Sequence, residues 1–154
     1  LFSFAGCWRR MTELRFSKID PLASAPTRAH PGDAGLDLCC LANVELGPSE
    51  RLRVATGIAV ELPPGYAGLI VPRSGLAAKH GLSIVNSPGL IDEGYRGELQ
   101  VLLLNTDRER AVSLQAGERI AQLVVISVAQ LAPVEVDSLD DSSRGDQGFG
   151  SSGR

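Results

Sequence analysis

Short apolar segments separated by Gly- and Pro-rich turns recur along most of the chain, and the stretch Leu82 to Asn105 shows this pattern most clearly. It has an apolar segment at each end and a loop of Asn, Pro, Gly and charged residues between them. Such a pattern predicts a β-hairpin with a long tip. Several side chains in the tip can bind or react, and functional groups often lie on loops held by a rigid scaffold.

Further short strands are expected on both sides of this hairpin. The pattern predicts strands at 14–19, 35–41, 66–71, 111–114 and 119–128, and two short strands around Gly57 within 51–62. One helix is expected between Pro72 and Gly81, with Ser74 capping its start and Gly81 ending it. Many short strands separated by turns predict an all-β sandwich or barrel with one short helix.

Two of the expected strands are apolar on both faces. In the outgoing strand of the hairpin, Leu99, Val101 and Leu103 form one face, and Leu102 and Leu104 lie on the other. The segment 119–128 repeats this arrangement. A strand that is apolar on both faces belongs in a sandwich core or at a subunit interface.

The length of 154 residues fits a single domain. We expect a β domain over 12–136, an upstream extension at 1–11 that ends at Met11, and a C-terminal tail at 137–154. The tail is rich in Gly, Ser, Asp and Arg, which is typical of a flexible segment. The formal net charge of -3 gives no reason to expect nucleic acid or a membrane surface as partner. No apolar run approaches the roughly 20 residues of a membrane span.

The cysteines indicate a reducing compartment. Cys39 and Cys40 are adjacent on an expected strand, where neighbouring side chains point to opposite faces, so they are not placed to bridge or to share a metal. The chain also has no CxxC spacing, which argues against a structural zinc site. A cytoplasmic location fits best.

Candidate chemistry centres on anion-binding groups and carboxylates. Arg73-Ser74-Gly75 and the Arg144 to Gly153 segment can bind phosphate, although neither matches the phosphate loop GxxxxGK[ST] of ordinary ATPases. Asp33, Asp37 and Asp92 can hold Mg²⁺, its waters or an attacking water.

The three aspartates, and several other candidate residues, also fit a purely structural role. Aspartates are common in turns for purely conformational reasons, and Asn86 fits a cap of the turn before Pro88. Tyr95 fits a core-filling aromatic residue, and Gln122 fits a buried amide that its neighbours satisfy.

Five segments considered together resemble the five motifs of the homotrimeric dUTP pyrophosphatase (dUTPase) family. They are DAGLD at 33–37, PRSGLA at 72–77, NSPGLIDEGYRGEL at 86–99, RIAQL at 119–123 and RGDQGFGSSG at 144–153. One such segment alone would be weak evidence, but all five in this order are specific. The resemblance covers nearly the whole chain after Met11.

The resemblance implies a dUTPase-like β jelly roll, also called a β-clip, that forms a homotrimer with three active sites shared between subunits. It implies hydrolysis of dUTP to dUMP and pyrophosphate with Mg²⁺, which keeps uracil out of DNA and supplies dUMP for thymidylate synthesis. Asp92 matches the aspartate that activates the water attacking the α-phosphorus. The residues matching the nucleoside contacts are Asn86, Leu90, Ile91 and Asp92 for uracil, Tyr95 under the deoxyribose, and Gln100 nearby.

The remaining matches concern the triphosphate, the metal and the tail. Arg73, Ser74, Gly75 and Gln122 match phosphate contacts, and Asp37 matches an acid that reaches the metal indirectly through water. The tail residues that match a segment closing over a neighbouring subunit's site are Arg144 at the γ-phosphate, Phe149 on the uracil, and Gly150, Ser151 and Ser152. Asp146 and Gln147 depart from the family pattern, because smaller residues are usual there and Asp146 would repel phosphate unless it points away.

Two rival functions are set against this one. The related dCTP deaminase shares the fold but places a catalytic Glu three residues before the Asn that ends the strand, and here that position is Leu102. A regulatory binding protein could keep the fold and signal through a partner. Such a protein would tolerate loss of Asp92 or Tyr95, and both are present.

Overall fold

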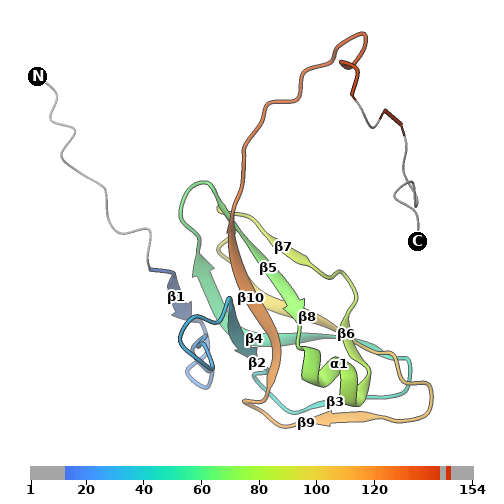
Figure 1. Cartoon of the computed structure of the whole chain (residues 1–154). Helices are drawn as coiled ribbons and strands as arrows, with labels where there is room; N and C mark the ends of the chain where they lie inside the picture. The colour runs from blue at the N-terminus through green and yellow to red at the C-terminus, as the bar shows by residue number, and fades with distance from the viewer. Residues whose placement is uncertain (1–12, 143–144, 147–154) are drawn as a thin grey trace, which may run out of the picture.

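The computed structural model describes residues 13–142 and 145–146, and these form a β structure with one short helix (Figure 1). The predicted upstream extension at 1–11 lies outside the described residues, as does most of the motif at 144–153. The elements are β1 (Arg15–Lys18), β2 (Gly35–Cys39), β3 (Val44–Leu46), β4 (Arg51–Glu61), β5 (Tyr66–Pro72), α1 (Ser74–His80), β6 (Leu82–Ile84), β7 (Gly89–Ile91), β8 (Glu98–Asn105), β9 (Val112–Leu114) and β10 (Arg119–Ser127).

Two four-stranded sheets and one strand pair make up the body of the molecule. The first sheet has the order β1-β4-β8-β6, the second has the order β2-β10-β5-β7, and β3 pairs with β9. All of these pairs are antiparallel. Most neighbours in a sheet are distant in sequence, as in a jelly roll, so the fold matches the expected all-β class.

The core draws apolar side chains from all three sheets into one cluster. Along β8 the side chains of Leu99, Val101 and Leu103 are buried, whereas Leu102 and Leu104 on the opposite face stay partly exposed. The strict alternation shows that only one face of β8 packs in this chain's own core. The second apolar face therefore remains partly exposed in the single chain.

Residues 51–61 form one strand, not the two short strands that the sequence suggested around Gly57. The pairing of β4 with β8 shifts register between Ala55 and Ala59, which marks a β-bulge. Gly57 adopts φ +69°, and a Cβ there would lie 2.7 Å from the Cβ of Ala23. Glycine allows the strand to pass through this irregular point without ending.

The helix α1 ends as predicted but begins differently. Gly81 adopts φ 63° and its N–H donates to the carbonyl of Ala77, so it terminates the helix as expected. At the start, Arg73 occupies the N-cap position in extended geometry and makes no side-chain cap hydrogen bond, and Ser74 is the first helical residue. The predicted capping role of Ser74 is therefore wrong.

The central hairpin is divided between the two large sheets. β6 and β8 pair in the first sheet, as the hairpin prediction requires, but the tip contains β7, which pairs with β5 in the second sheet. The tip residues that follow β7 are thereby held against the β4–β5 turn: the carboxylate of Glu93 accepts a hydrogen bond from the Gly65 N–H at 2.6 Å.

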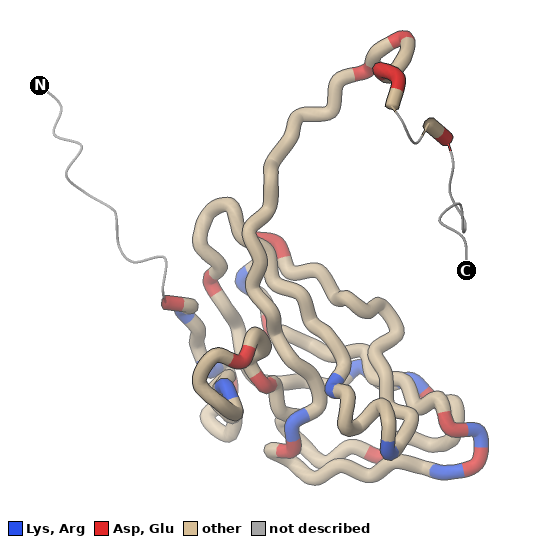
Figure 2. Tube along the Cα trace, in the orientation of Figure 1, with Lys and Arg blue, Asp and Glu red and all other residues tan. Residues whose placement is uncertain are grey.

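After β10 the described chain runs away from the body of the molecule as an extended segment (Figure 1). Its charged residues up to residue 142 are all acidic (Figure 2). Four large apolar side chains on it are more than half exposed: Leu131, Val134, Val136 and Leu139. Such exposed apolar side chains are a surface suited to contact with another chain.

Candidate active site

One group of predicted site residues meets around a buried carboxylate, and we call it the arginine–aspartate cluster: Asp37, Arg73, Arg119 and Gln122. β10 lies between β2 and β5, so Asp37 on β2, Arg73 just after β5, and the two β10 residues come together. Asp37 is 4% exposed, and its Oδ2 lies 3.2 Å from the Arg119 Nη1. Its Oδ1 lies 3.5 Å from both the Arg73 Nε and the Gln122 Nε2.

The cluster carries a surplus of positive charge, because two guanidinium groups surround one carboxylate. Arg73 also donates from Nη1 to the carbonyl oxygen of Arg119 at 3.0 Å, which fixes the fork of its guanidinium. A guanidinium has five N–H donors, so these contacts leave donors free for an anion. The neighbouring Gly75 has open space where a Cβ would stand, which leaves room for a ligand to reach its backbone. The arrangement is suited to phosphate.

Gly35 gives Gln122 the space in which its side chain lies. A Cβ on Gly35 would stand 3.0 Å from the Cβ and 3.1 Å from the Cδ of Gln122. Any larger residue would push the Gln122 amide away from Asp37. The glycine of the DAGLD segment is thus explained by packing against the amide of the RIAQL segment.

Cys39 lies next to this cluster, since it pairs with Arg119 across β2 and β10. Burial raises the pKa of the Cys39 thiol, and the negative charge of Asp37 acts in the same direction. The thiol therefore stays protonated and neutral at pH 7, which adds no negative charge beside the arginines.

A second group lies at the tip of the hairpin and carries Asp92 and Tyr95. Asp92 follows β7 directly and is exposed, and its carbonyl oxygen accepts a hydrogen bond from the Tyr95 N–H at 3.0 Å. Tyr95 is 43% exposed, so it does not fill the core, and that interpretation is wrong. Its ring lies over Gly97, where a Cβ would stand 2.5 Å from the Tyr95 hydroxyl oxygen. The hydroxyl donates to the carbonyl of Glu98 at 2.9 Å.

The two groups stand at opposite ends of the second sheet. Ile91 lies opposite Gly68 on β5, so Asp92 is level with Ala67, whereas Arg73 follows the other end of that strand. Six residues of extended strand separate the two levels, which corresponds to roughly 20 Å. No side chain spans such a distance, so the two groups of one chain cannot act on the same phosphate.

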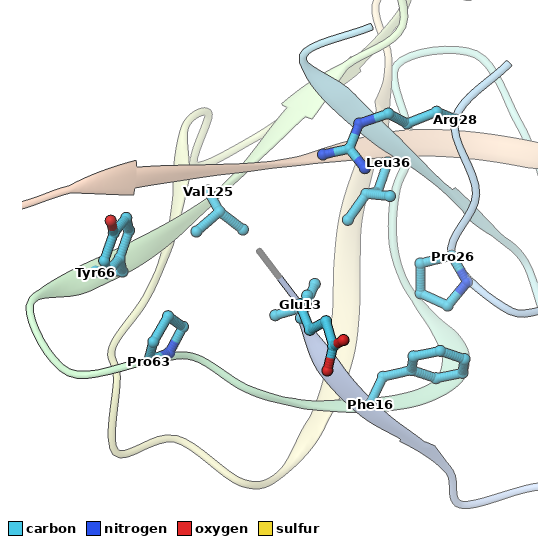
Figure 3. A pocket seen from close by; sticks show the side chains of 9 residues that line it. Glu13, Phe16, Pro26, Arg28, Leu36, Pro63, Tyr66 and Val125 are labelled. Atoms are coloured by element: carbon cyan, nitrogen blue, oxygen red, sulfur yellow. The ribbon is translucent and has the colours of Figure 1, made fainter. Parts of the chain in front are cut away.

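Two of the surface cavities formed by the described residues are lined by none of the predicted site residues. The larger, of about 350 Å³, is lined by residues from β1, β2, β5, β10 and neighbouring loops, including Phe16, Tyr66 and Val125 (Figure 3). None of the nine lining residues is a predicted site residue. A site assembled from two chains would not form a cavity in one chain.

The comparisons with known proteins identify the family. The dUTPase family model matches residues 22–153. The chain belongs to the dUTPase family. Among similar proteins, the deoxyuridine 5'-triphosphate nucleotidohydrolase of Nocardia farcinica is 55% identical over 143 residues, covering 93% of this chain and 87% of its own. That of Thermobifida fusca is 58% identical over 136 residues, covering 88% and 76%.

Solved dUTPase structures share the fold. The Staphylococcus bacteriophage 80alpha dUTPase with dUPNHPP has a TM-score of 0.86 and 32% identity, covering 93% of this chain and 99% of the phage chain. A variant of the phage phi11 dUTPase of S. aureus, reported with a structural Mg(II) ion, has a TM-score of 0.77 and 27% identity, covering 84% and 99%. The jelly-roll dUTPase fold expected from the sequence is confirmed.

The structure places the other predicted residues of this dUTPase-family chain as follows. Leu90 and Ile91 form β7 beside Asp92, Asn86 lies just before β7, and Gln100 is exposed on β8. The predicted tail residues Arg144, Phe149, Gly150, Ser151 and Ser152 lie outside the described residues.

Two further residues of these groups were not predicted: Arg119, which contacts Asp37, and Glu98, which contacts Tyr95 and Gln100. Both stand inside the segments that resemble family motifs, so their presence in RIAQL and YRGEL was the available signal. Over the described residues, no group of three or more His, Cys, Asp or Glu side chains is arranged to hold a metal ion. In the same part of the chain, no helix is long and apolar enough to cross a membrane.

Proposed function

We propose that the protein hydrolyses dUTP to dUMP and pyrophosphate; its relatives are named deoxyuridine 5'-triphosphate nucleotidohydrolases. Such an activity keeps uracil out of DNA and supplies dUMP for thymidylate synthesis. The main structural support, besides membership of the family, is the distance between the two groups of site residues. The arginine–aspartate cluster and the exposed carboxylate of Asp92 lie roughly 20 Å apart on one chain. The cluster alone has no carboxylate positioned to activate water, and the hairpin tip alone lacks the cluster's phosphate-binding residues. Two different chains together would supply both.

The proposed assembly is a homotrimer with shared active sites. Support comes from the apolar outer face of β8, where Leu102 and Leu104 are only partly buried, and from the exposed apolar side chains of the C-terminal segment. Both surfaces would be covered by neighbouring subunits. In this arrangement the arginine–aspartate cluster of one subunit faces the hairpin tip of the next, and the residues from 144 onward close over the site.

In the proposed reaction the triphosphate lies on Arg73, Ser74, Gly75 and Gln122. Fixed N–H groups directed at the phosphate oxygens stabilise the negative charge that develops as the leaving group departs. The guanidinium of Arg73 is already oriented by Asp37 and by the carbonyl of Arg119, so little rearrangement accompanies binding.

Asp92 is proposed to accept a proton from the attacking water. The water oxygen forms a bond to the α-phosphorus, and the bond from that phosphorus to the oxygen bridging the β-phosphorus breaks, which releases pyrophosphate. Because Glu93 and Arg96 hold the tip in place, Asp92 projects from a rigid support: the Arg96 Nη1 donates to the Glu93 carbonyl at 2.6 Å. General base catalysis of this kind contributes about 10²–10⁴-fold in rate.

The nucleoside is proposed to lie along the hairpin, with uracil against Asn86 and Leu90 to Asp92, and the deoxyribose on Tyr95. The exposed ring of Tyr95 is locked over Gly97 by its hydroxyl hydrogen bond, so it offers a flat surface of fixed orientation. A 2′-hydroxyl would clash with this surface. Phe149 of the closing segment would cover the base from the other side, and Arg144 would reach the γ-phosphate.

The donor set around Asp37 fits Mg²⁺ that is carried by the triphosphate and its waters. Two guanidinium groups and one amide already contact the Asp37 carboxylate, so a directly bound cation would meet strong repulsion. The contacts of 3.2–3.5 Å leave acceptor positions for a water. Asp37 is therefore proposed to reach the metal only through water. When bound, Mg²⁺ would neutralise part of the triphosphate charge and polarise its phosphorus–oxygen bonds.

A cytoplasmic location is also proposed. It is supported by the free thiols of Cys39 and Cys40, which are stable in a reducing compartment.

The test is pyrophosphate release in Mg²⁺ from dUTP, dTTP, UTP and dCTP at equal concentration. We expect dUTP to be hydrolysed far faster than the other three nucleotides. Comparable rates with all four would contradict the specificity. Asp92→Asn should still bind dUTP and should lose about 10²–10⁴-fold in kcat. An unimpaired Asp92→Asn variant would remove Asp92 from its role.

A further inference from the structure

Glu98, at the start of β8, makes three hydrogen bonds that join separate parts of the nucleoside end of the site. Its Oε1 accepts from the Gly57 N–H at 2.7 Å, and its Oε2 accepts from the Gln100 Nε2 at 2.8 Å. Its backbone carbonyl accepts from the Tyr95 hydroxyl at 2.9 Å. One residue thus connects β4 with two side chains that lie along the hairpin.

The contact with Gly57 belongs to the bulge in β4. Because the β4–β8 register shifts there, the ladder is interrupted opposite Leu99, between the pairs Ala55–Gln100 and Ala59–Glu98. The Thr56 hydroxyl donates to the Leu99 carbonyl at 2.6 Å, and the Glu98 carboxylate accepts from Gly57. Backbone groups in a bulge need such replacement partners, since an unpaired buried N–H is costly. The carboxylate is therefore held at a fixed position.

The contact with Gln100 determines which way its amide points. An ionised carboxylate only accepts hydrogen bonds, so the group of Gln100 facing Glu98 must be the NH₂. The carbonyl oxygen of the same amide is then turned away from Glu98, on an exposed side chain. What Gln100 presents to a ligand is a hydrogen-bond acceptor.

We infer that Glu98 is a positioning residue that fixes the Gln100 amide, so that its oxygen accepts a hydrogen bond from the nucleoside. The inference rests on the proposed function, because it assumes that the nucleoside lies along this hairpin. The ligand group recognised is a donor, and dUTP offers two, the 3′-hydroxyl of the sugar and the N3–H of uracil. Glu98 acts through Gln100 and does not touch the substrate.

The substitution Glu98→Gln distinguishes the positioning of Gln100 from the support that Glu98 gives to the bulge at Gly57. The new amide keeps an oxygen for the Gly57 N–H, but it then directs its NH₂ at Gln100. Gln100 must turn over to accept this bond, which presents its own NH₂ to the nucleoside in place of the oxygen. We expect KM for dUTP to rise about tenfold, as for one lost ligand hydrogen bond, with kcat within about threefold and an unchanged thermal midpoint.

Three comparisons distinguish positioning from a general structural effect. The inhibition constant of dUMP should rise by the same factor as KM, whereas that of pyrophosphate should not change, because the phosphate cluster is untouched. In a Gln100→Ala background, Glu98→Gln should have no further effect on KM. The matched control is Glu45→Gln, which makes the same change at a hydrogen-bonded carboxylate away from the site. The Glu45 Oε2 accepts a hydrogen bond from the Ser113 hydroxyl at 2.6 Å on the separate β3–β9 pair. Its kinetic constants should stay at wild-type values.

Two substrates identify the donor. If it is the 3′-hydroxyl, Glu98→Gln has no effect on KM for 2′,3′-dideoxy-UTP. If it is the uracil N3–H, the effect persists with that analogue, and discrimination against dCTP falls about tenfold because cytosine N3 is an acceptor. An effect that persists with the dideoxy analogue without a change in dCTP discrimination would overturn the inference.

A wild-type KM for dUTP in Glu98→Gln would also overturn it. These results are distinct from failure of the proposed function, which would appear as absence of selective dUTP hydrolysis by the wild-type protein.

Discussion

Mixing two inactive variants should restore activity, because the two halves of the proposed site come from different chains. The variants are Arg73→Ala, which disables the phosphate cluster, and Asp92→Asn, which disables the hairpin tip. Arg73 and Asp92 lie at opposite ends of the second sheet, roughly 20 Å apart within one chain. Each variant alone assembles sites that all carry the same defect.

The expected magnitude follows from counting sites in a random mixture. A working site needs its phosphate cluster from an Asp92→Asn chain and its tip from an Arg73→Ala chain. In an equal mixture each condition holds half of the time, so about a quarter of the sites are intact. The mixture should therefore show about a quarter of the wild-type kcat per chain.

The assay is pyrophosphate release from dUTP after the two variants are unfolded together and refolded. Each variant carried alone through the same treatment is the control, and size-exclusion chromatography checks that all samples assemble alike. If the mixture only reaches the sum of the separate variants although mixed assemblies form, the two residues act in sites of one chain, and the argument for sharing is wrong.

Three further predictions concern residues that support the site. Gly35→Ala should raise KM and destabilise the fold by about 1–3 kcal/mol in thermal unfolding, because its Cβ would stand 3.0 Å from the Cβ of Gln122; unchanged values would show that Gln122 shifts freely. Arg119→Ala should lower the free energy of unfolding by about 1–3 kcal/mol, since it removes the nearest cation from the buried Asp37, and Arg119→Lys should recover part of this. Deleting residues 143–154 should lower kcat without changing the thermal midpoint of the body; normal turnover of the truncated chain would contradict the closing role of the tail.

The sequence predicted most strands but not how they pair. Short apolar segments between turns correctly located β1, β5 and β10. The half-buried pattern expected of β1 is not seen in the single chain, because all four residues of this strand are exposed. It did not predict β3, whose three residues are stabilised by pairing with β9 far along the chain. Nor did it predict that β7 leaves the hairpin for the second sheet. Both are long-range pairings, which local patterns do not encode.

Gly57 and Ser74 show two local signals that tertiary structure changed. Glycine often ends a strand, but here its positive φ allows a bulge, and the side chains of Thr56 and Glu98 satisfy the interrupted ladder. Serine often caps a helix, but the pairing of β5 with β10 continues to Pro72 and moves the cap position to Arg73. In each case contacts with distant strands outweigh a preference of the residue itself.

The sequence could predict which residues belong to the candidate site, but it could not predict how these residues are arranged in space. The motif resemblance identified Asp37, Arg73 and Gln122, and the structure brings them together because β10 lies between β2 and β5. Arg119 and Glu98 were missed because their contacts with Asp37 and with Gly57 join segments that are distant in sequence, and such contacts form only when the strands are paired.

A crystal structure of the protein with Mg²⁺ and a non-hydrolysable dUTP analogue would show whether each active site is shared between chains. We expect the triphosphate to contact Arg73 and Gln122 of one chain, while Asp92 of another chain holds a water in line with the α-phosphorus. A structure in which Asp92 points away from the α-phosphorus, or in which no second chain contacts the ligand, would contradict this expectation.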